Sequence, residues 1–174
     1  MESANPYNDA CQTRKSRVSG AFRCLLLGSF LLLLQPALGQ TSYIKRYKPL
    51  ADSLSEVYGI PASVILGVAI IESGAGTSRN AKLLNNHFGI VGKNNLLRTK
   101  GIRSRYKQYP TAAASYAGFC QLLSRKRFYA KLKGNNDYKA WLEAMSKSGY
   151  SESPAEWKKR VGATIRKHKL SDTP

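Results

Sequence analysis

The chain has 174 residues, of which 43% are hydrophobic and 22% are charged, a balance typical of a globular domain rather than a disordered or fibrous chain. Lys and Arg total 28 against 10 Asp and Glu, so the formal net charge of +18 excludes an acidic binding protein and favours a polyanionic partner. Nucleic acid, an anionic membrane and an acidic cell-wall polymer all fit that charge. The 3 cysteines are too few and too scattered for a zinc site or a disulfide framework.

Residues 1–39 have the order of a secretory signal peptide. A basic stretch around Arg14 and Arg17 precedes the apolar run of residues 24–34, and small residues follow it. We expect cleavage near Gly39–Gln40, which leaves residues 40–174 as one exported domain in the periplasm or cell envelope, or secreted. The run is shorter than the roughly 20 apolar residues that span a bilayer. An uncleaved anchor is therefore the weaker alternative, and the membrane is involved only before cleavage.

Hydrophobic periodicity in residues 40–174 predicts a mainly helical domain. The predicted helices cover residues 43–58, 62–72, 78–84, 111–124, 137–148 and 154–168. The second of these is apolar on every side, so we expect it at the buried centre, ended by Gly74 in a left-handed conformation. Between residues 88 and 109 the glycines and Asn94-Asn95 interrupt the helical pattern, and short strands in an irregular hairpin are predicted. The expected fold class is mainly α, with a small β element (α+β).

The candidate chemistry concentrates on Glu72, which ends the most apolar predicted helix. Residues 73–136 contain thirteen basic side chains and no acidic one. The C-terminal end of a helix disfavours a carboxylate, and burial beside Ile70 and Ile71 disfavours it further, so both effects raise its pKa. Such a glutamate suits a general acid that protonates a glycosidic oxygen near neutral pH. A surface glutamate paired with one of the nearby cations is the alternative.

Several other conspicuous residues have ordinary structural explanations. Trp141 and Trp157 lie on apolar helical stripes and are expected in the core rather than as sugar platforms. His87 is expected to be structural or solvated, and His168 lies near a helix C-terminus, where a cation is favourable. With two histidines and few acids, the sequence supports no metal site and implies no cofactor.

Four segments resemble, in order, the motifs of the bacterial endo-β-N-acetylglucosaminidase family, which includes flagellar peptidoglycan hydrolases and autolysins. They are residues 60–74, residues 85–90 (like Asn-Asn-x-Phe-Gly-Ile), residues 106–110 (like a Phe-Arg-x-Tyr strand) and residues 149–154 (like Gly-Tyr-Ala-Thr-Asp-Pro). The resemblance covers roughly residues 43–170. It implies a lysozyme-like helical domain with a small irregular β-hairpin lobe flanking a cleft.

The resemblance also implies an activity and a set of site residues. The family cuts the β-1,4 bond after N-acetylglucosamine in peptidoglycan. Its motifs carry over to Glu72 as the catalytic acid, to Tyr150 as a cleft tyrosine, and to a binding wall of Asn86, Phe88, Gly89 and Tyr109. The composition agrees in kind, because sugar faces stack on aromatic rings and peptidoglycan carries lactyl and peptide carboxylates that a basic surface attracts.

The sequence departs from the family pattern at the second acidic group. Many glycosidases use two carboxyls, but residues 88–109 contain none, an Asp-His pair is absent after Ser115, and the motif's aspartate is Ser153 with Glu152 beside it. Three mechanisms stay open: attack by the substrate's own 2-acetamido group, Glu152 as base with Tyr150 orienting water, or a lytic-transglycosylase route through the 6-hydroxyl of muramic acid. We favour the first and third over Glu152. Loss of activity is a fourth outcome.

A second class of function is a cationic binding module for cell wall or nucleic acid. The charge supports it, but the export signal separates the chain from most DNA, and no nucleic-acid-binding motif is present. The expected partner is therefore the peptidoglycan glycan strand, with no specific nucleic acid. The oligomeric state is left open, with a monomer favoured.

Overall fold

The computed structural model describes the backbone of residues 21–171 and the side chains of residues 39–171. The basic stretch of the predicted signal peptide lies outside the described residues, and only the backbone of its apolar run is described. The chain divides into two compact units, residues 1–35 and 36–174. The domain discussed below belongs to the second unit.

Helix α1 (Ala21–Tyr58) ends where the sequence predicts but begins well before the expected residue 43. The predicted cleavage position, Gly39–Gln40, therefore lies within this helix. Within the described part of the chain, no helix combines the length and hydropathy needed to cross a lipid bilayer. The apolar side chains of the second half of α1 reach the core through Tyr43 and Ala51.

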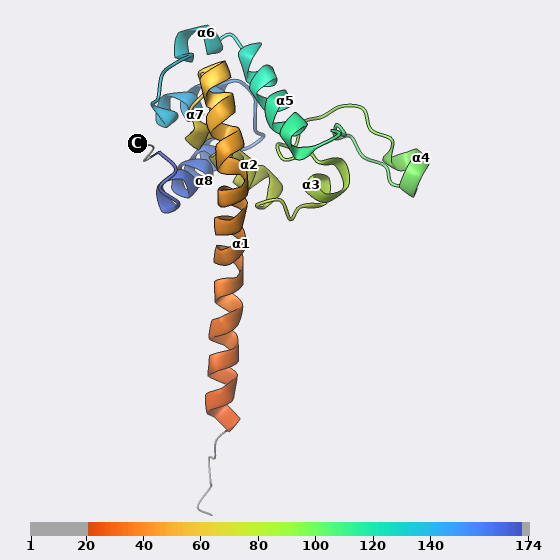
Figure 1. Cartoon of the computed structure of the whole chain (residues 1–174), viewed down its shortest axis with the longest axis vertical. Coiled ribbons are helices and arrows are strands. Elements are labelled where there is room, and N and C mark those ends of the chain that lie inside the picture. The colour runs from red at the N-terminus through yellow and green to blue at the C-terminus, as the bar shows by residue number, and fades with distance from the viewer. Residues whose placement is uncertain (1–20, 172–174) are drawn as a thin grey trace, which may run out of the picture. The chain divides into compact units, whose positions relative to one another are not determined.

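Helix α2 (Ala62–Ser73) lies at the centre of the domain, as predicted. Every residue from Ser63 to Ile70 is buried. Gly74 follows with φ 55° and ψ 47°, and its N–H donates to the carbonyl of Ile70, so the expected left-handed glycine ends the helix. A helix that is apolar all round must be covered on all sides, and the other helices do this (Figure 1).

Helices α7 (Tyr138–Lys147) and α8 (Pro154–Lys167) pack against α2 and against each other. The approach of α8 is close: a Cβ placed on Gly67 of α2 would lie 2.7 Å from Cγ1 of Ile165. Glycine at this position lets the two backbones approach. Trp157, Val161 and Ile165 form one buried stripe along α8, so this contact sets where the N-terminal end of α8 meets α2.

Three further helices complete the domain. Ser78 caps α3 (Arg79–Leu84) and Thr111 caps α5 (Ala112–Ser124), each by accepting a backbone N–H from the first turn. Both helices fall within the predicted ranges. The short helix α6 (Tyr129–Leu132) is not predicted, because its sequence lies within a cluster of basic residues that interrupts the periodicity.

The predicted β-hairpin lobe is not formed among the described residues, and this expectation is corrected. Residues 88–109 form an extended arm with one antiparallel bridge, between Val91 and Tyr106, and a short helix α4 (Leu96–Lys100) at its far end (Figure 1). Three backbone hydrogen bonds cross the arm around this bridge. Nδ2 of Asn94 adds two more, to the carbonyls of Ser104 and Tyr106, both at 2.8 Å. The glycines and asparagines that predict a hairpin therefore belong to an arm whose two sides are joined without regular strands.

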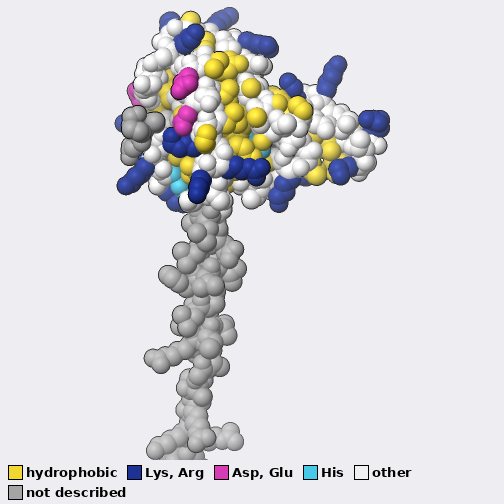
Figure 2. Space-filling view, in the orientation of Figure 1, with side chains coloured by type: hydrophobic (Ala, Val, Ile, Leu, Met, Phe, Trp, Pro, Cys, Tyr) yellow, Lys and Arg dark blue, Asp and Glu magenta, His cyan; other side chains and the backbone are white. Residues whose placement is uncertain are grey.

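Positive charge predominates among the charged side chains on the visible face of the domain (Figure 2). In Figure 2 the Lys and Arg side chains are spread around the visible face, whereas Asp and Glu occupy a small area. The described ion pairs are few, and Glu143 takes part in two of them, with Lys158 at 2.6 Å and with Lys147 at 2.9 Å. These two lysines lower the pKa of Glu143 to about 2. Most of the excess cations therefore remain available to a polyanionic partner.

Candidate functional site

Glu72 lies in the last turn of α2, partly buried among apolar neighbours. Burial raises the pKa of its carboxyl, while a hydrogen bond from Trp157 and the positive charge of Arg160 partly oppose the rise. The direction agrees with the prediction from sequence. A carboxyl with a raised pKa keeps its proton to higher pH than a solvated glutamate, as a general acid requires.

The two oxygens of Glu72 have different surroundings. Trp157 donates its indole N–H to Oε1 at 2.8 Å. Oε2 accepts no hydrogen bond from any described residue and faces Gly89, where a Cβ would lie 3.6 Å from it. The carboxyl is thus held at one oxygen and open at the other.

Gly89 keeps the space beside Oε2 free. Its backbone has φ +65°, a left-handed conformation that glycine adopts without strain. A side chain at this position would cover the open carboxyl oxygen as well as straining the turn. The expected proximity of Gly89 to Glu72 is therefore present in the structure.

Tyr150 lies beside the same carboxyl. Its ring packs 5.2 Å from that of Trp157 and 6.0 Å from that of Phe119, and its hydroxyl donates to the carbonyl of Phe88 at 3.4 Å. Burial raises the pKa of Tyr150 well above its ordinary value, and the negative charge of Glu72 raises it further. The phenol therefore stays protonated and acts as a hydrogen-bond donor next to Glu72.

Asn86 and Phe88 have supporting positions rather than the direct binding positions that the resemblance implies. Nδ2 of Asn86 donates to the carbonyls of Ile90 and Lys107, both at 2.8 Å, and its Oδ1 accepts the backbone N–H of Ile90 at 3.1 Å. Phe88 stacks on Phe119 with ring centroids 4.2 Å apart and is buried. Both side chains are committed to the fold, and together they build the turn that presents Gly89.

The remaining two predicted site residues, Tyr109 and Glu152, lie in different surroundings. Tyr109 is buried, with Nζ of Lys107 over its ring at 4.7 Å, and it lies near enough to Tyr150 to contribute to the raised pKa of that phenol. The side chain of Glu152 is instead 97% exposed, and its described contact is a 4.0 Å approach to Arg105. No described contact brings Glu152 to Glu72.

Trp157 belongs to the candidate site, although the sequence predicts it only as a core residue. Its apolar stripe correctly predicts burial, at 6% exposure. A buried indole N–H needs a hydrogen-bond acceptor. This requirement is the one sign in the sequence that Trp157 contacts a polar group. The acceptor could not be identified from the sequence, because Glu72 and Trp157 are 85 residues apart. Among residues with described side chains, no group of three His, Cys, Asp or Glu is placed to hold a metal ion.

Comparisons with known proteins agree with this fold. The chain is 27% identical over 157 residues to the exo-glucosaminidase LytG of Bacillus subtilis. The aligned region covers 76% of this chain and 55% of LytG. The chain thus spans about half the length of that relative.

Solved structures of similar fold include the catalytic domain of the autolysin Auto from Listeria monocytogenes, with a TM-score of 0.63 and 22% identity over 76% of this chain and 86% of that one. The glycoside hydrolase domain of FlgJ from Salmonella typhimurium has a TM-score of 0.59 and 22% identity over 75% and 88% of the two chains. The family model described as mannosyl-glycoprotein endo-beta-N-acetylglucosaminidase matches residues 48–170. The chain therefore belongs to the glucosaminidase family.

Proposed function

We propose that this protein is an exported peptidoglycan glycosidase that cleaves the β-1,4 bond after N-acetylglucosamine, with Glu72 as the general acid. Family membership and the exo-glucosaminidase activity named for the relative LytG support the class of reaction. The similar solved structures, the catalytic domain of an autolysin and a glycoside hydrolase domain, support a glycan of the cell wall as the substrate. The predicted signal segment and the excess of basic residues fit an enzyme of the cell envelope.

One observation carries the proposal: the carboxyl of Glu72 is held at Oε1 by Trp157 and open at Oε2 beside Gly89. A general acid must be fixed in orientation and still reach the leaving oxygen of its substrate. The hydrogen bond on Oε1 provides the first property. The absence of a side chain on Gly89 provides the second, because a glycosidic oxygen can approach Oε2.

The position of Glu152 favours a mechanism with a single protein carboxyl. Its exposed side chain has no described contact with Glu72 or Tyr150. In the route that we favour, Glu72 protonates the leaving oxygen while the substrate's 2-acetamido oxygen attacks the anomeric carbon, and water then opens the resulting ring. This requires the enzyme to supply one acid, and some glycosidases use such assistance from their substrate. We assign to the protonated hydroxyl of Tyr150 the role of orienting the acetamido group or the water, in exchange for its 3.4 Å hydrogen bond to the carbonyl of Phe88.

The transglycosylase alternative also needs a single glutamate, because the 6-hydroxyl of muramic acid attacks in place of water. The two routes leave different sugar ends on the cleaved glycan. Hydrolysis after N-acetylglucosamine leaves a reducing N-acetylglucosamine, whereas the alternative leaves 1,6-anhydromuramic acid. Mass spectrometry of products, with and without borohydride reduction, distinguishes them.

The test compares the parent protein, Glu72→Gln and Glu156→Gln on purified peptidoglycan. Glu156 is an exposed glutamate in the first turn of α8 and serves as the matched control for loss of one negative charge. We expect reducing N-acetylglucosamine ends from the parent and from Glu156→Gln, and a loss of at least about a thousandfold in rate for Glu72→Gln with folding intact.

Three results would contradict parts of the proposal. Equal cleavage by Glu72→Gln would remove Glu72 from the reaction. Anhydromuramic products from the parent would transfer the protein to the transglycosylase class. Binding to peptidoglycan without any product would leave a cationic wall-binding domain.

A further inference from the structure

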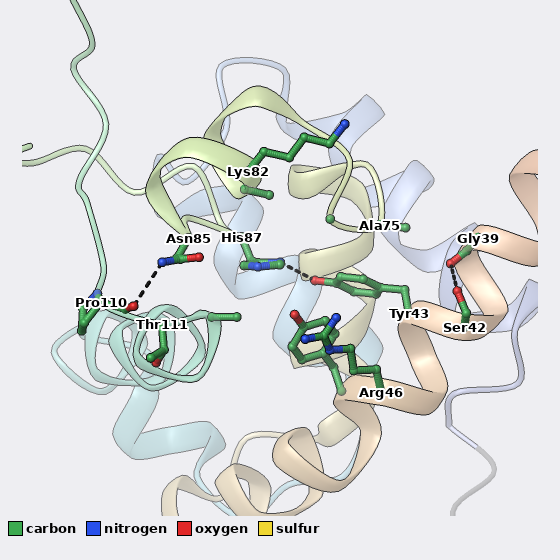
Figure 3. A pocket seen from close by; sticks show the side chains of 14 residues that line it. Gly39, Ser42, Tyr43, Arg46, Ala75, Lys82, Asn85, His87, Pro110 and Thr111 are labelled. Atoms are coloured by element: carbon green, nitrogen blue, oxygen red, sulfur yellow. Dashed lines mark hydrogen bonds between the residues drawn. The ribbon is translucent and has the colours of Figure 1, made fainter. Parts of the chain in front are cut away.

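A pocket whose described lining does not include Glu72 or Gly89 lies beside helix α1. It has a volume of about 680 Å³ and is bounded by the second half of α1, the loop after α2, α3 and the first turn of α5 (Figure 3). This volume is within the range of pockets that bind small ligands, about 300–1,000 Å³. None of the Glu72 neighbourhood lines it, so the site described above does not account for it.

The pocket is lined by a largely buried histidine that has a described hydrogen-bond partner at only one ring nitrogen. His87 is 5% exposed and lines the pocket, and its Nδ1 lies 2.7 Å from the hydroxyl of Tyr43. No described residue bonds its Nε2. Every fully buried side-chain nitrogen and oxygen among the described residues does have a partner. The Nε2 atom therefore reaches open space, and the space that His87 borders is this pocket (Figure 3).

The surrounding hydrogen bonds define what Nε2 offers. Tyr116 donates its hydroxyl to the oxygen of Tyr43 at 2.8 Å, which leaves the proton of the Tyr43 hydroxyl available to Nδ1 of His87, 2.7 Å away. An imidazole that accepts at Nδ1 carries its proton on Nε2. Burial and the charge of Arg46 both lower the pKa of His87, so the ring is neutral near pH 7. In the tautomer in which Nδ1 accepts the bond from Tyr43, Nε2 offers the pocket one neutral N–H donor.

The rest of the lining is cationic and partly aromatic. Arg46 and Lys82 lie at the pocket from opposite walls, on α1 and α3, and Tyr47 adds an aromatic face. No acidic residue is among the described residues that line it. The first turn of α5 also borders the pocket, and the N-terminal end of a helix favours an anion. Two cations and a neutral donor around a pocket with aromatic walls fit a carboxylate on a small organic molecule.

We propose that this pocket binds a carboxylate of the peptide stem of peptidoglycan, an inference that rests on the proposed function. Ala75 lines the pocket and follows Glu72 by three residues, so their Cα atoms are no more than about 11 Å apart. A stem of four extended residues spans about 13 Å. A four-residue stem is therefore long enough to cover the distance between these two backbone positions, and a stem held in the pocket would raise the local concentration of substrate at the catalytic carboxyl.

Nuclear magnetic resonance of the two histidines tests binding without relying on catalysis. The full chain with Glu72→Gln is labelled on histidine, and the Nε2 signals of His87 and His168 are followed. His168, which contacts Gln40 outside the pocket, is the internal control. The probes are a soluble disaccharide with its peptide stem, the same disaccharide without the peptide, and inorganic phosphate. We expect saturable shifts of His87 with the first probe and none with the second.

Charge variants test the assignment to this pocket. Lys82→Gln and Arg46→Gln each remove a lining cation, and we expect each to weaken binding of the stem-bearing disaccharide about fivefold or more, equal to about 1 kcal/mol. Lys45→Gln is the matched control, because Lys45 is exposed, lies next to Arg46 in sequence and does not line the pocket. The affinity of that variant should change less than twofold.

Each other outcome overturns the assignment. An unmoved His87 signal would show that the stem does not enter the pocket. A shift with phosphate as large as that with the stem-bearing disaccharide would make this a general anion site. An equal loss of affinity in Lys45→Gln would reduce the effect to net charge. These results are separate from the proposed function, since a shift of His87 without cleavage by the parent protein would leave a stem-binding domain that is not a glycosidase.

Discussion

The indole nitrogen of Trp157 lies 2.8 Å from Oε1 of Glu72, and this hydrogen bond joins the N-terminal end of α8 to the C-terminal end of α2. Its position follows from helix packing. Gly67 and Ile165 bring the two helices together, and Trp157 lies two turns before Ile165 on the same buried stripe. The orientation of the candidate catalytic acid is therefore a consequence of how α2 and α8 pack.

Replacing Trp157 by Phe should remove the hydrogen bond while keeping an aromatic ring in place. The bond stabilises the ionised carboxyl, so its loss should raise the pKa of Glu72 further and move the alkaline limb of the pH profile of kcat/KM to higher pH. We also expect kcat/KM to fall about tenfold or more, since a hydrogen bond to a charged group contributes about 1.5–3 kcal/mol.

Trp141→Phe is the matched control. Trp141 is equally buried, and its indole N–H donates to the backbone carbonyl of Asn135 at 2.8 Å, away from Glu72. Both variants should lose about 1 kcal/mol of stability. If the alkaline limb moves equally in both, or in neither, the hydrogen bond does not tune Glu72.

Stability should depend on pH through Glu72 itself. Burial raises its pKa, so the folded chain holds this proton more tightly than the unfolded chain does. The carboxyl thus supports folding fully below its ordinary pKa of 4.5, and this contribution is lost as the pH rises through the folded-state pKa. Glu72→Gln carries no such charge, so its free energy of unfolding relative to the parent should increase between pH 4 and pH 7. Urea unfolding at both pH values measures the difference, and a decrease would show that ionised Glu72 is stabilised by the fold.

Gly89→Ala should separate backbone strain from obstruction of Glu72. The substitution places a methyl group 3.6 Å from Oε2 at a residue with φ +65°. Gly101→Ala is the matched control, because Gly101 has φ +67° and nothing within 4 Å of its Cβ position. Both changes should destabilise by about 1–2 kcal/mol in thermal or denaturant unfolding. Only Gly89→Ala should lower kcat/KM, by about tenfold or more, and an equal fall in both would attribute the effect to strain.

Processing at Gly39–Gln40 can be measured directly. Intact-mass analysis of the protein recovered from the envelope of a producing cell should show a chain that begins at Gln40. The Gln40 side chain already contacts Nε2 of His168 at 2.8 Å, so the new terminus would remain attached to the end of α8. A full-length mass in the membrane fraction would instead establish the uncleaved anchor.

Much of the fold follows from the sequence by itself. The run from Val64 to Ile71 is apolar on all sides and can only be a buried central helix, and glycine at position 74 supplies the left-handed residue that ends it. The periods of the α5, α7 and α8 segments predict helices because each has an apolar face that must be buried. These are local properties, and neighbouring residues determine them.

The tertiary structure decided the arm and the candidate site. Residues 88–109 contain the glycines and asparagines typical of a hairpin, but their backbone forms a single isolated bridge, and the side-chain amides of Asn86 and Asn94 supply further bonds to carbonyls of the arm. The sequence motifs predict that Gly89, Tyr150 and Glu152 belong to one site. In the structure the first two lie beside Glu72, whereas Glu152 is exposed to solvent. The partner of Trp157 and the open Nε2 of His87 depend on contacts between residues distant in the chain, which periodicity cannot encode.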